Sequence, residues 1–413
     1  MATDSTFVVV GASLAGAKAA ETLRGEGFDG RIVLLGAEPD RPYERPPLSK
    51  DYLRGESGRD KIYVHEEGYY PEQEIDLRSS TTVTQVDPGS SEVVLRDGER
   101  IGYDRLLLTT GSEPRRLSIP GADLDGVHYL RSVVDSDELR ERLQSGDGRV
   151  VVIGAGWIGS EVAASARQLG REVTLLEQTE VPLERVLGRD LGLIYREIHT
   201  DQGVEFIGGG GVERIEGSGA VERVVLGGGR TVDCDLVVVG VGVTPRVQLA
   251  EAAGLAIDNG VRVNAALETS VEGIYAAGDL ANAHHPLFDT GIRVEHWANA
   301  LNQGPAAARS MLGQEVSYDR VPYFFSDQYD VGMEYTGHAV DWDEVVFRGE
   351  VDSREFVAFW LKGGRVLAGM NVNVWDVTDP IQALVRSRQP VDRARLVDTG
   401  VSLEELASEV ARS

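Results

Sequence analysis

Cysteine is almost absent from this chain of 413 residues, in which Cys234 is the only one. A single cysteine excludes a Cys-x-x-Cys pair for disulfide exchange and a four-cysteine set for an iron–sulfur cluster. Cys234 stands just before the apolar run Leu236–Val239, so we interpret it as a structural thiol at the start of a buried strand. We also expect no metal site. Any electron that leaves this protein must therefore go to a centre carried by another molecule.

Long apolar runs and a basic N-terminus are also missing. No stretch of about 18 uninterrupted apolar residues occurs, so we expect no membrane span. The segment Met1–Ser5 has no basic residue ahead of the first apolar run, unlike a secretory signal peptide. We therefore expect a cytoplasmic location.

Positive charge is scarce as well. The net charge is −26, and lysine occurs only at Lys18, Lys50, Lys61 and Lys362. A surface of this sign repels the phosphates of nucleic acids and of anionic lipids. We therefore expect neither a nucleic acid nor a membrane as partner.

The chain begins with a pattern typical of a dinucleotide-binding fold. Phe7–Val10 are apolar without alternation, which predicts a buried parallel strand, and the turn Gly11-Ala-Ser-Leu-Ala-Gly16 follows directly. Gly11 permits the tight turn, the small Ser13 lets the backbone approach a ligand, and Gly16 lets the helix pack close to the strand. The N–H groups and the dipole at the helix start attract a pyrophosphate. Ser13 replaces the second glycine of the strict pattern, and an ordinary strand-to-helix turn is the alternative.

The same pattern recurs in Val150-Val-Val-Ile-Gly154-Ala-Gly156-Trp-Ile-Gly159, which has all three glycines. Glu38 and Glu177 follow the second strands of the two copies, where a carboxylate binds the ribose hydroxyls of an adenosine. A carboxylate at Glu177 repels a 2′-phosphate and favours NADH over NADPH, although Arg185 and Arg189 lie farther along the chain. Two dinucleotide-binding folds in one chain predict two cofactors.

The segment Pro42-Tyr-Glu-Arg-Pro-Pro-Leu-Ser-Lys50 follows the first fold's second strand. Its three prolines keep the backbone extended up to Pro47, where a short helix begins. The helix start and the charges of Arg45 and Lys50 suit an electron-rich ring system or a diphosphate, while a surface loop is the alternative. Placed after a Gly-x-Ser-x-Ala-Gly turn, this motif resembles the FAD-dependent ferredoxin reductases of the putidaredoxin reductase and aromatic-ring dioxygenase reductase type. The resemblance covers essentially the whole chain.

The resemblance implies an α/β fold with two Rossmann-like dinucleotide-binding domains in a glutathione-reductase-like topology, followed by a C-terminal α+β domain. A chain of this length is too long for one hydrophobic core, which agrees with several domains. The expected segments are 1–115 and 244–320 for the FAD-binding domain, 116–243 for the NAD-binding domain and 321–413 for the C-terminal domain.

Several residues acquire expected roles from this resemblance. Lys50 would lie beside the reactive nitrogen of the flavin, with Glu161 near the nicotinamide and Trp297 against the isoalloxazine. From the residues alone, a solvated helix glutamate is the alternative for Glu161, and a buried core tryptophan is the alternative for Trp297. Asp279, after the short strand within Glu272–Ala277, would accept hydrogen bonds from the ribityl and diphosphate part of FAD. Arg131 would lie against the flavin, and a surface arginine is its alternative.

In the family, an acidic residue follows the glycine that ends the second strand. Here Ala37 takes that place and Glu38 comes next.

Two sets of candidate binding residues result. The FAD-binding candidates are Gly11, Ser13, Leu14, Ala15, Gly16, Ala37, Glu38, Arg45, Lys50, Val83, Thr110, Gly111, Arg131, Asp279, His296 and Trp297. The NADH-binding candidates are Gly154, Gly156, Trp157, Ile158, Gly159, Glu161, Glu177 and Gly242. Lys50, Glu161 and Trp297 are the candidates for a catalytic role.

The implied function is an NADH-dependent ferredoxin reductase. NADH would give a hydride to bound FAD, which would pass single electrons to a ferredoxin, most simply one with a two-iron two-sulfur cluster. That ferredoxin would serve a haem-thiolate monooxygenase or a Rieske-type dioxygenase. Lys50 would favour the negative charge that the flavin gains, and Glu161 would orient Lys50 or the carboxamide. We expect a monomer or a weak homodimer.

Three other functions remain open at this point. A rubredoxin reductase would share every motif and differ only in its acceptor. NADH oxidases and peroxidases of this fold use an active cysteine, for which Cys234 is badly placed. A signalling flavoprotein that resembles apoptosis-inducing factor is expected to have a basic surface and long insertions, both of which this chain lacks.

Overall fold

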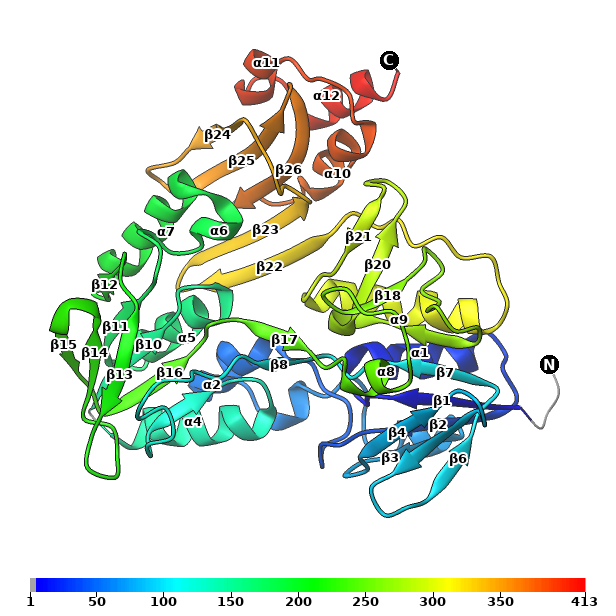
Figure 1. Cartoon of the computed structure of the whole chain (residues 1–413). Coiled ribbons are helices and arrows are strands. Elements are labelled where there is room, and N and C mark those ends of the chain that lie inside the picture. The colour runs from blue at the N-terminus through cyan, green and yellow to red at the C-terminus, as the bar shows by residue number, and fades with distance from the viewer. Residues whose placement is uncertain (1–4, 147, 413) are drawn as a thin grey trace.

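The computed structural model describes residues 5–146 and 148–412. The N-terminal residues 1–4, which carried the expectation of no signal peptide, lie outside this part. Figure 1 shows two sheet-and-helix bodies side by side, with a third body lying over both. Within the described ranges, no helix is both long enough and apolar enough to span a membrane.

The first body is built on a parallel sheet with the strand order β19-β7-β1-β2-β3. Its strands are β1 (Thr6–Val10), β2 (Arg31–Leu35), β3 (Ile75–Arg78), β7 (Arg105–Leu108) and β19 (Ile274–Ala276). The central strands are buried on both faces, as a parallel sheet between helices and other layers requires. The helices α1 (Leu14–Gly25) and α9 (Trp297–Met311) pack against each other there. Strand β19 therefore returns to this sheet after the whole second body has been built.

The second body repeats this plan with the order β12-β11-β10-β16-β9. Its strands are β9 (Val127–Tyr129), β10 (Arg149–Ile153), β11 (Glu172–Leu176), β12 (Glu205–Ile207) and β16 (Leu236–Val239). Its helices are α4 (Val133–Ser145), α5 (Trp157–Gln168), α6 (Glu184–Leu187) and α7 (Arg189–Asp201). In both bodies the strand before the glycine turn is paired up to its last residue, Val10 with Leu35 and Ile153 with Leu176. The two turns therefore start at equivalent places.

The chain crosses between the first two bodies at one place. Strand β8 (Ser112–Pro114) runs out of the first body and pairs antiparallel with β17 (Val243–Pro245), which runs back. This pairing keeps the two crossings together and fixes where the second body is attached.

Smaller elements decorate this frame. They are the sheets β4 (Val83–Asp87), β5 (Glu92–Leu95) and β6 (Arg100–Gly102); β13 (Val212–Glu216), β14 (Arg223–Leu226) and β15 (Thr231–Asp233); and β18 (Val261–Val263), β20 (Ala281–His285) and β21 (Thr290–Ile292). The short helices are η1 (Pro46–Ser49), α2 (Asp51–Arg54), η2 (Arg59–Lys61), α3 (Tyr69–Glu72), η3 (Gly227–Gly229), α8 (Gln248–Ala252) and η4 (Gly278–Leu280).

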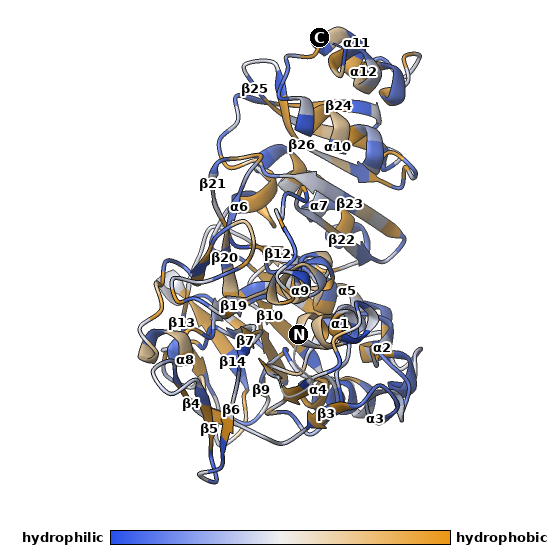
Figure 2. Cartoon of the chain, turned by 90° about the vertical axis from the view of Figure 1, so that its right-hand side faces the viewer, coloured by the Kyte–Doolittle hydropathy of each residue, from blue (hydrophilic) through white to orange (hydrophobic). Residues whose placement is uncertain are grey.

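The third body is an antiparallel sheet with the order β22-β23-β26-β25-β24. Its strands are β22 (Tyr323–Gln328), β23 (Val331–Gly337), β24 (Glu344–Glu350), β25 (Glu355–Lys362) and β26 (Arg365–Val372). One face packs on α7 of the second body, and the other is covered by α10 (Thr378–Ser387) and α12 (Leu403–Val410), with α11 (Arg393–Val397) beside them. Figure 2 shows apolar residues concentrated on the strands of the sheets. The predicted fold class is confirmed by these three bodies.

Candidate functional site

A cavity opens where the three bodies meet. Its walls come from the start of α1, the segment 43–50, the start of α5, the turn after β19, the start of α9 and strand β22. A second cavity continues along the first glycine turn toward Glu38 and Val83. The two share the wall residues Ser13, Arg45, Thr109, Gly111 and Arg131. Together they form one elongated groove across the end of the first parallel sheet.

The first glycine turn is tight because backbone atoms crowd it. Gly11 has φ +121°, and a Cβ there would lie 2.2 Å from the carbonyl oxygen of Thr109. A Cβ at Gly16 would lie 2.1 Å from the carbonyl oxygen of Gly11. Ser13 is the N-cap of α1, and its side chain makes no capping hydrogen bond with the described residues. Its hydroxyl and the N–H groups at the helix start thus face the groove, which suits a diphosphate.

The second glycine turn has the same constraints and one open position. A Cβ at Gly154 would lie 2.5 Å from the carbonyl oxygen of Gly240, and one at Gly159 only 1.9 Å from that of Gly154. A Cβ at Gly156 would meet no other described atom within 4 Å. The protein itself therefore has no need of glycine at position 156. An open approach at this position is what a pyrophosphate against the backbone requires.

Glu38 lies at the end of the groove for which an adenosine contact was predicted, and it already has partners. Arg45 forms an ion pair with it at 2.8 Å, and the hydroxyl of Tyr43 donates a hydrogen bond to its other oxygen. Burial alone would raise the pKa of Glu38, but the charge of Arg45 and the bond from Tyr43 outweigh it and lower the pKa. Glu38 is therefore a carboxylate that holds Arg45 in the groove wall, and the ribose contact predicted for it would have to share these oxygens.

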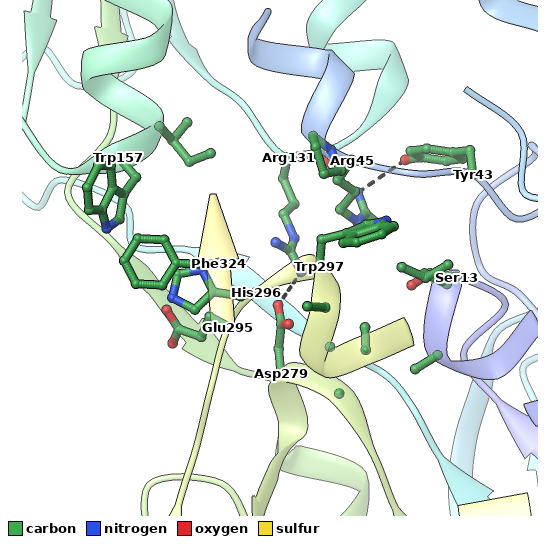
Figure 3. A pocket seen from close by; sticks show the side chains of 18 of the residues that line it. Ser13, Tyr43, Arg45, Arg131, Trp157, Asp279, Glu295, His296, Trp297 and Phe324 are labelled. Carbon is green, nitrogen blue, oxygen red and sulfur yellow. Dashed lines mark hydrogen bonds and ion pairs between the residues drawn. The ribbon is translucent and has the colours of Figure 1, made fainter. Parts of the chain in front are cut away.

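Arg131 and Asp279 form an ion pair in the groove at 2.7 Å (Figure 3). Burial lowers the pKa of Arg131, and Asp279 opposes that effect. The Nε of Arg131 and the Nε1 of Trp297 are both buried and have no hydrogen-bond partner in the described part of the chain. Buried donors without acceptors are costly, so these two fit a bound molecule rich in acceptors, as FAD is. The surface-arginine alternative for Arg131 is wrong.

Lys50 and Glu161 meet at the cavity from two different bodies. The Lys50 Nζ lies 3.1 Å from the Glu161 Oε2, and their side chains are only 12% and 4% exposed. Ser49 donates to the same oxygen at 2.5 Å, and Ser326 donates to the Glu161 Oε1 at 2.7 Å. Glu161 is therefore an anchored carboxylate, and its reading as a solvated helix residue is wrong.

The start of α5 brings the second body to this cavity. Trp157 and Ile158 both line it, and Ile158 is 48% exposed at its mouth. The ring of His296 stacks on Phe324 at 4.2 Å between centroids, and Figure 3 shows both rings beside Trp157. Burial lowers the pKa of His296 to about 4, so its imidazole is neutral. Trp297, at the start of α9, lies edge-on to Phe325 with 6.0 Å between ring centroids.

The structure does not bring all the predicted residues to the groove. Most of the FAD candidates line one of its two halves, and so do Trp157, Ile158 and Glu161. The predicted residues that line neither half lie on the two glycine turns or at strand ends, and they are Gly16, Gly154, Gly156, Gly159, Glu177 and Gly242. Further wall or anchoring residues were not predicted from the sequence, namely Tyr43, Ser49, Thr109, Glu295, Phe324, Phe325 and Ser326. Tyr43 and Ser49 lie inside the quoted motif, which was the available signal.

Glu177 is held beside the second glycine turn. Its Oε2 accepts from the Ala155 N–H at 2.7 Å and its Oε1 from the Gln178 N–H at 2.7 Å. We expect the double change Glu177→Ala with Gln178→Arg to reduce the preference for NADH over NADPH by at least about tenfold, since a repelling carboxylate becomes a guanidinium. Steady-state kcat/KM for both nucleotides measures this. An unchanged ratio would remove Glu177 from the nucleotide site.

Cys234 lies in the core of the second body and not at the groove. Burial raises the pKa of its thiol to about 12, and Asp235 adds to the shift. We expect this thiol to react with Ellman's reagent only after denaturation, and Cys234→Ala to keep at least about half of the wild-type turnover. A large loss of turnover with the protein still folded would revive the oxidase or peroxidase alternative.

Comparison with known proteins adds family information to this geometry. The family model described as pyridine nucleotide-disulphide oxidoreductase matches residues 5–304, and the one described as reductase C-terminal matches residues 323–407. Putidaredoxin reductase CamA of Pseudomonas putida is 36% identical over 412 residues, which cover 98% of this chain and 97% of that protein. The ferredoxin–NAD(+) reductase component of the anthranilate 1,2-dioxygenase system of Burkholderia cepacia is 37% identical over 405 residues, covering 96% of this chain and 98% of that one.

Solved structures agree with these relatives. A chain in the crystal structure of the covalent putidaredoxin reductase–putidaredoxin complex has a TM-score of 0.96 and 35% identity to this chain, with 100% of both covered. The likeness thus includes the way the three bodies are arranged around the groove.

Proposed function

Because this chain belongs to the pyridine nucleotide-disulphide oxidoreductase family, and within it to the ferredoxin–NAD(P)+ reductases, we propose that it carries electrons from NADH through FAD to a two-iron two-sulfur ferredoxin. It is a reductase component of the kind found in oxygenase electron-transfer systems. The ferredoxin would in turn serve a haem-thiolate monooxygenase or a Rieske-type dioxygenase.

The observation that carries this proposal is the meeting of two nucleotide-binding helix starts at one cavity. The start of α1 lies on one side, and the start of α5 contributes Trp157, Ile158 and Glu161. A ring bound along the first fold and a nicotinamide bound along the second would therefore face each other here. Holding two reacting rings at contact distance turns their reaction into a positioned, first-order step.

The groove residues divide between binding and orientation. FAD supplies the chemistry when bound, since it accepts a hydride and gives up electrons one at a time. Ser13, Arg45, Arg131 and Asp279 would hold its diphosphate and ribityl parts. Lys50 places an ammonium group at the cavity, and Glu161 fixes the direction of that group.

The nicotinamide nucleotide would lie along the second fold. Gly156 leaves the backbone open to its pyrophosphate, and Glu177 would accept hydrogen bonds from its ribose. The exposed Ile158 would border the nicotinamide at the cavity mouth.

Electrons would leave on the side of the third body. Trp297 and Phe325 form the cavity wall between the start of α9 and strand β22. We place the acceptor against this side because Trp297 and Phe325 line the cavity there and both are only partly buried. The lack of a redox-active cysteine fits direct transfer from the flavin to an external centre.

The test is to purify the yellow protein, add NADH without oxygen, and follow flavin bleaching at 450 nm. Bleaching followed by reduction of a two-iron two-sulfur ferredoxin, read through cytochrome c, is the expected result. A colourless protein, or one that NADH does not bleach, would contradict the proposal. Preferential reduction of rubredoxin would transfer the assignment to that acceptor, and a long-lived reduced complex that reduces neither would favour a signalling flavoprotein.

A further inference from the structure

We propose that Ser326, which the C-terminal body contributes, is a positioning residue for the Lys50–Glu161 pair, a role that rests on the function proposed for that pair. The carboxylate of Glu161 receives three donors from two segments of the chain, which are Ser49–Lys50 and strand β22. Lys50 and Ser49 donate to its Oε2, and Ser326 is the only donor to its Oε1 within the described residues. Both serines are almost fully buried, so bulk water does not compete with their hydroxyls for the carboxylate.

Ser326 is itself held by a chain of hydrogen bonds that continues into the second body. The Gln328 Nε2 donates to the Ser326 Oγ at 3.3 Å, and the Gln328 Oε1 lies 3.0 Å from the His199 Nε2. The His199 Nδ1 lies 3.1 Å from the hydroxyl of Tyr329. Strand β22 is therefore fixed to α7 at Gln328 and to α5 at Ser326.

Each hydrogen bond in this series from Tyr329 to Glu161 has a fixed donor and a fixed acceptor. Gln328 accepts from His199 through an amide oxygen, so the His199 Nε2 must carry the hydrogen and the Nδ1 must accept from Tyr329. Burial lowers the pKa of His199 to about 4, in agreement with one neutral tautomer. Gln328 then donates to Ser326, and Ser326 has its hydrogen left for Glu161. Every bond is thus directed toward the carboxylate, which is kept as an acceptor facing Lys50.

This series of hydrogen bonds positions Glu161 and does not conduct protons to it. A relay to Tyr329 would have to pass through the amide of Gln328, which has no exchangeable acidic form near neutral pH. An amide in the middle instead fixes the rotamers of the groups on both sides.

The register between β22 and α5 explains why Ser326 meets Glu161. Trp157 and Glu161 are four residues apart on α5, which is about 6 Å along a helix. Phe324 and Ser326 are two residues apart on β22, which is about 6.8 Å along a strand. Phe324 packs edge-on against Trp157 with 5.0 Å between centroids, so Ser326 arrives opposite Glu161. The third body thereby completes a site whose charges come from the other two.

The test is a double-mutant cycle on the FAD-loaded protein. We expect Ser326→Ala to slow flavin reduction by NADH about tenfold in anaerobic rapid mixing and to shift the midpoint potential of the bound FAD to a more negative value. NADH affinity should stay within about twofold. Ser326→Thr, which keeps the hydroxyl, should restore the rate and the potential. In the Lys50→Ala background, Ser326→Ala should have no further effect, since its effect passes through that pair.

The control is Ser353→Ala, which removes an exposed hydroxyl from the same body and should match the wild type. A Ser326→Ala variant with wild-type rate and potential would overturn the inference, as would additive effects in the cycle. Should the alanine variant lose FAD, Ser326→Cys keeps the shape with a weak donor. Loss of FAD there too would mean that the hydroxyl supports the fold only. Failure of the wild type to be bleached by NADH would instead count against the proposed function.

Discussion

Replacing Lys50 with alanine is expected to slow flavin reduction by NADH about a hundredfold while the Kd for NADH changes less than about threefold. A hundredfold loss corresponds to about 2.7 kcal/mol of transition-state stabilisation. The ammonium of Lys50 lies in a cavity wall where it is 12% exposed, so its charge is poorly screened by water. Its removal would take a positive group away from the place where the flavin gains negative charge.

Rapid mixing with NADH over a range of concentrations separates the limiting rate from the affinity. Lys61→Ala is the matched control because it removes an exposed lysine that forms an ion pair with its neighbour Asp60 on the surface. Some loss of stability is expected as well, since Glu161 would keep its two serine donors but lose its counter-charge. A variant that retains FAD and is reduced at the wild-type rate would remove Lys50 from the reacting centre.

The sequence predicts the two glycine turns well because their constraints are local. A positive φ at Gly11 and Gly154 and the close approach of Gly16 and Gly159 leave only glycine at these places. Such constraints recur in every fold of this kind, so they are visible in the sequence as a fixed spacing of glycines. The two dinucleotide-binding folds followed from the repetition of this turn after two unalternating apolar strands, whereas the glutathione-reductase-like topology was implied by the family resemblance.

The anchoring of Glu161 was not predictable in the same way. Its donors Ser49 and Ser326 lie 112 and 165 residues away in the chain. A serine on an antiparallel strand has no local signature of such a role. Phe324, Ser326 and Gln328 are every second residue of the strand, and this pattern predicts only that they share one buried face. Where residues from three bodies meet, the contact depends on how the bodies pack, and local patterns do not record it.

Glu38 illustrates a different limit. The sequence places a carboxylate after the second strand and predicts a ribose contact from its position alone. The structure shows Arg45 and Tyr43 on its two oxygens, because the segment after the strand folds back over the groove. A motif predicts the place of a side chain better than it predicts the partners that compete for it.

Enlarging Gly156 is expected to weaken NADH binding about a hundredfold in Gly156→Val and to leave FAD binding and thermal stability close to those of the wild type. Its φ of −77° is open to any residue, and an added Cβ meets no described atom within 4 Å beyond the adjoining backbone, so the free protein has room for the first carbon of a side chain. In the proposed complex, the pyrophosphate of NADH would occupy the open space next to Gly156. Gly159→Ala is the contrasting variant, since its Cβ would lie 1.9 Å from the carbonyl oxygen of Gly154 and should disrupt the second body itself.

We expect the loss of NADH affinity to increase with the size of the side chain at position 156. The first fold has Ser13 at the equivalent place, so Gly156→Ser should be milder than Gly156→Val, with Gly156→Ala between the wild type and valine. Titration of each variant with NADH, together with its FAD content and Tm, separates binding from folding. Equal NADH affinity across the series would show that the nucleotide does not approach this turn. A fall in affinity that follows side-chain volume, at constant FAD content, would place the pyrophosphate against the backbone of Gly156.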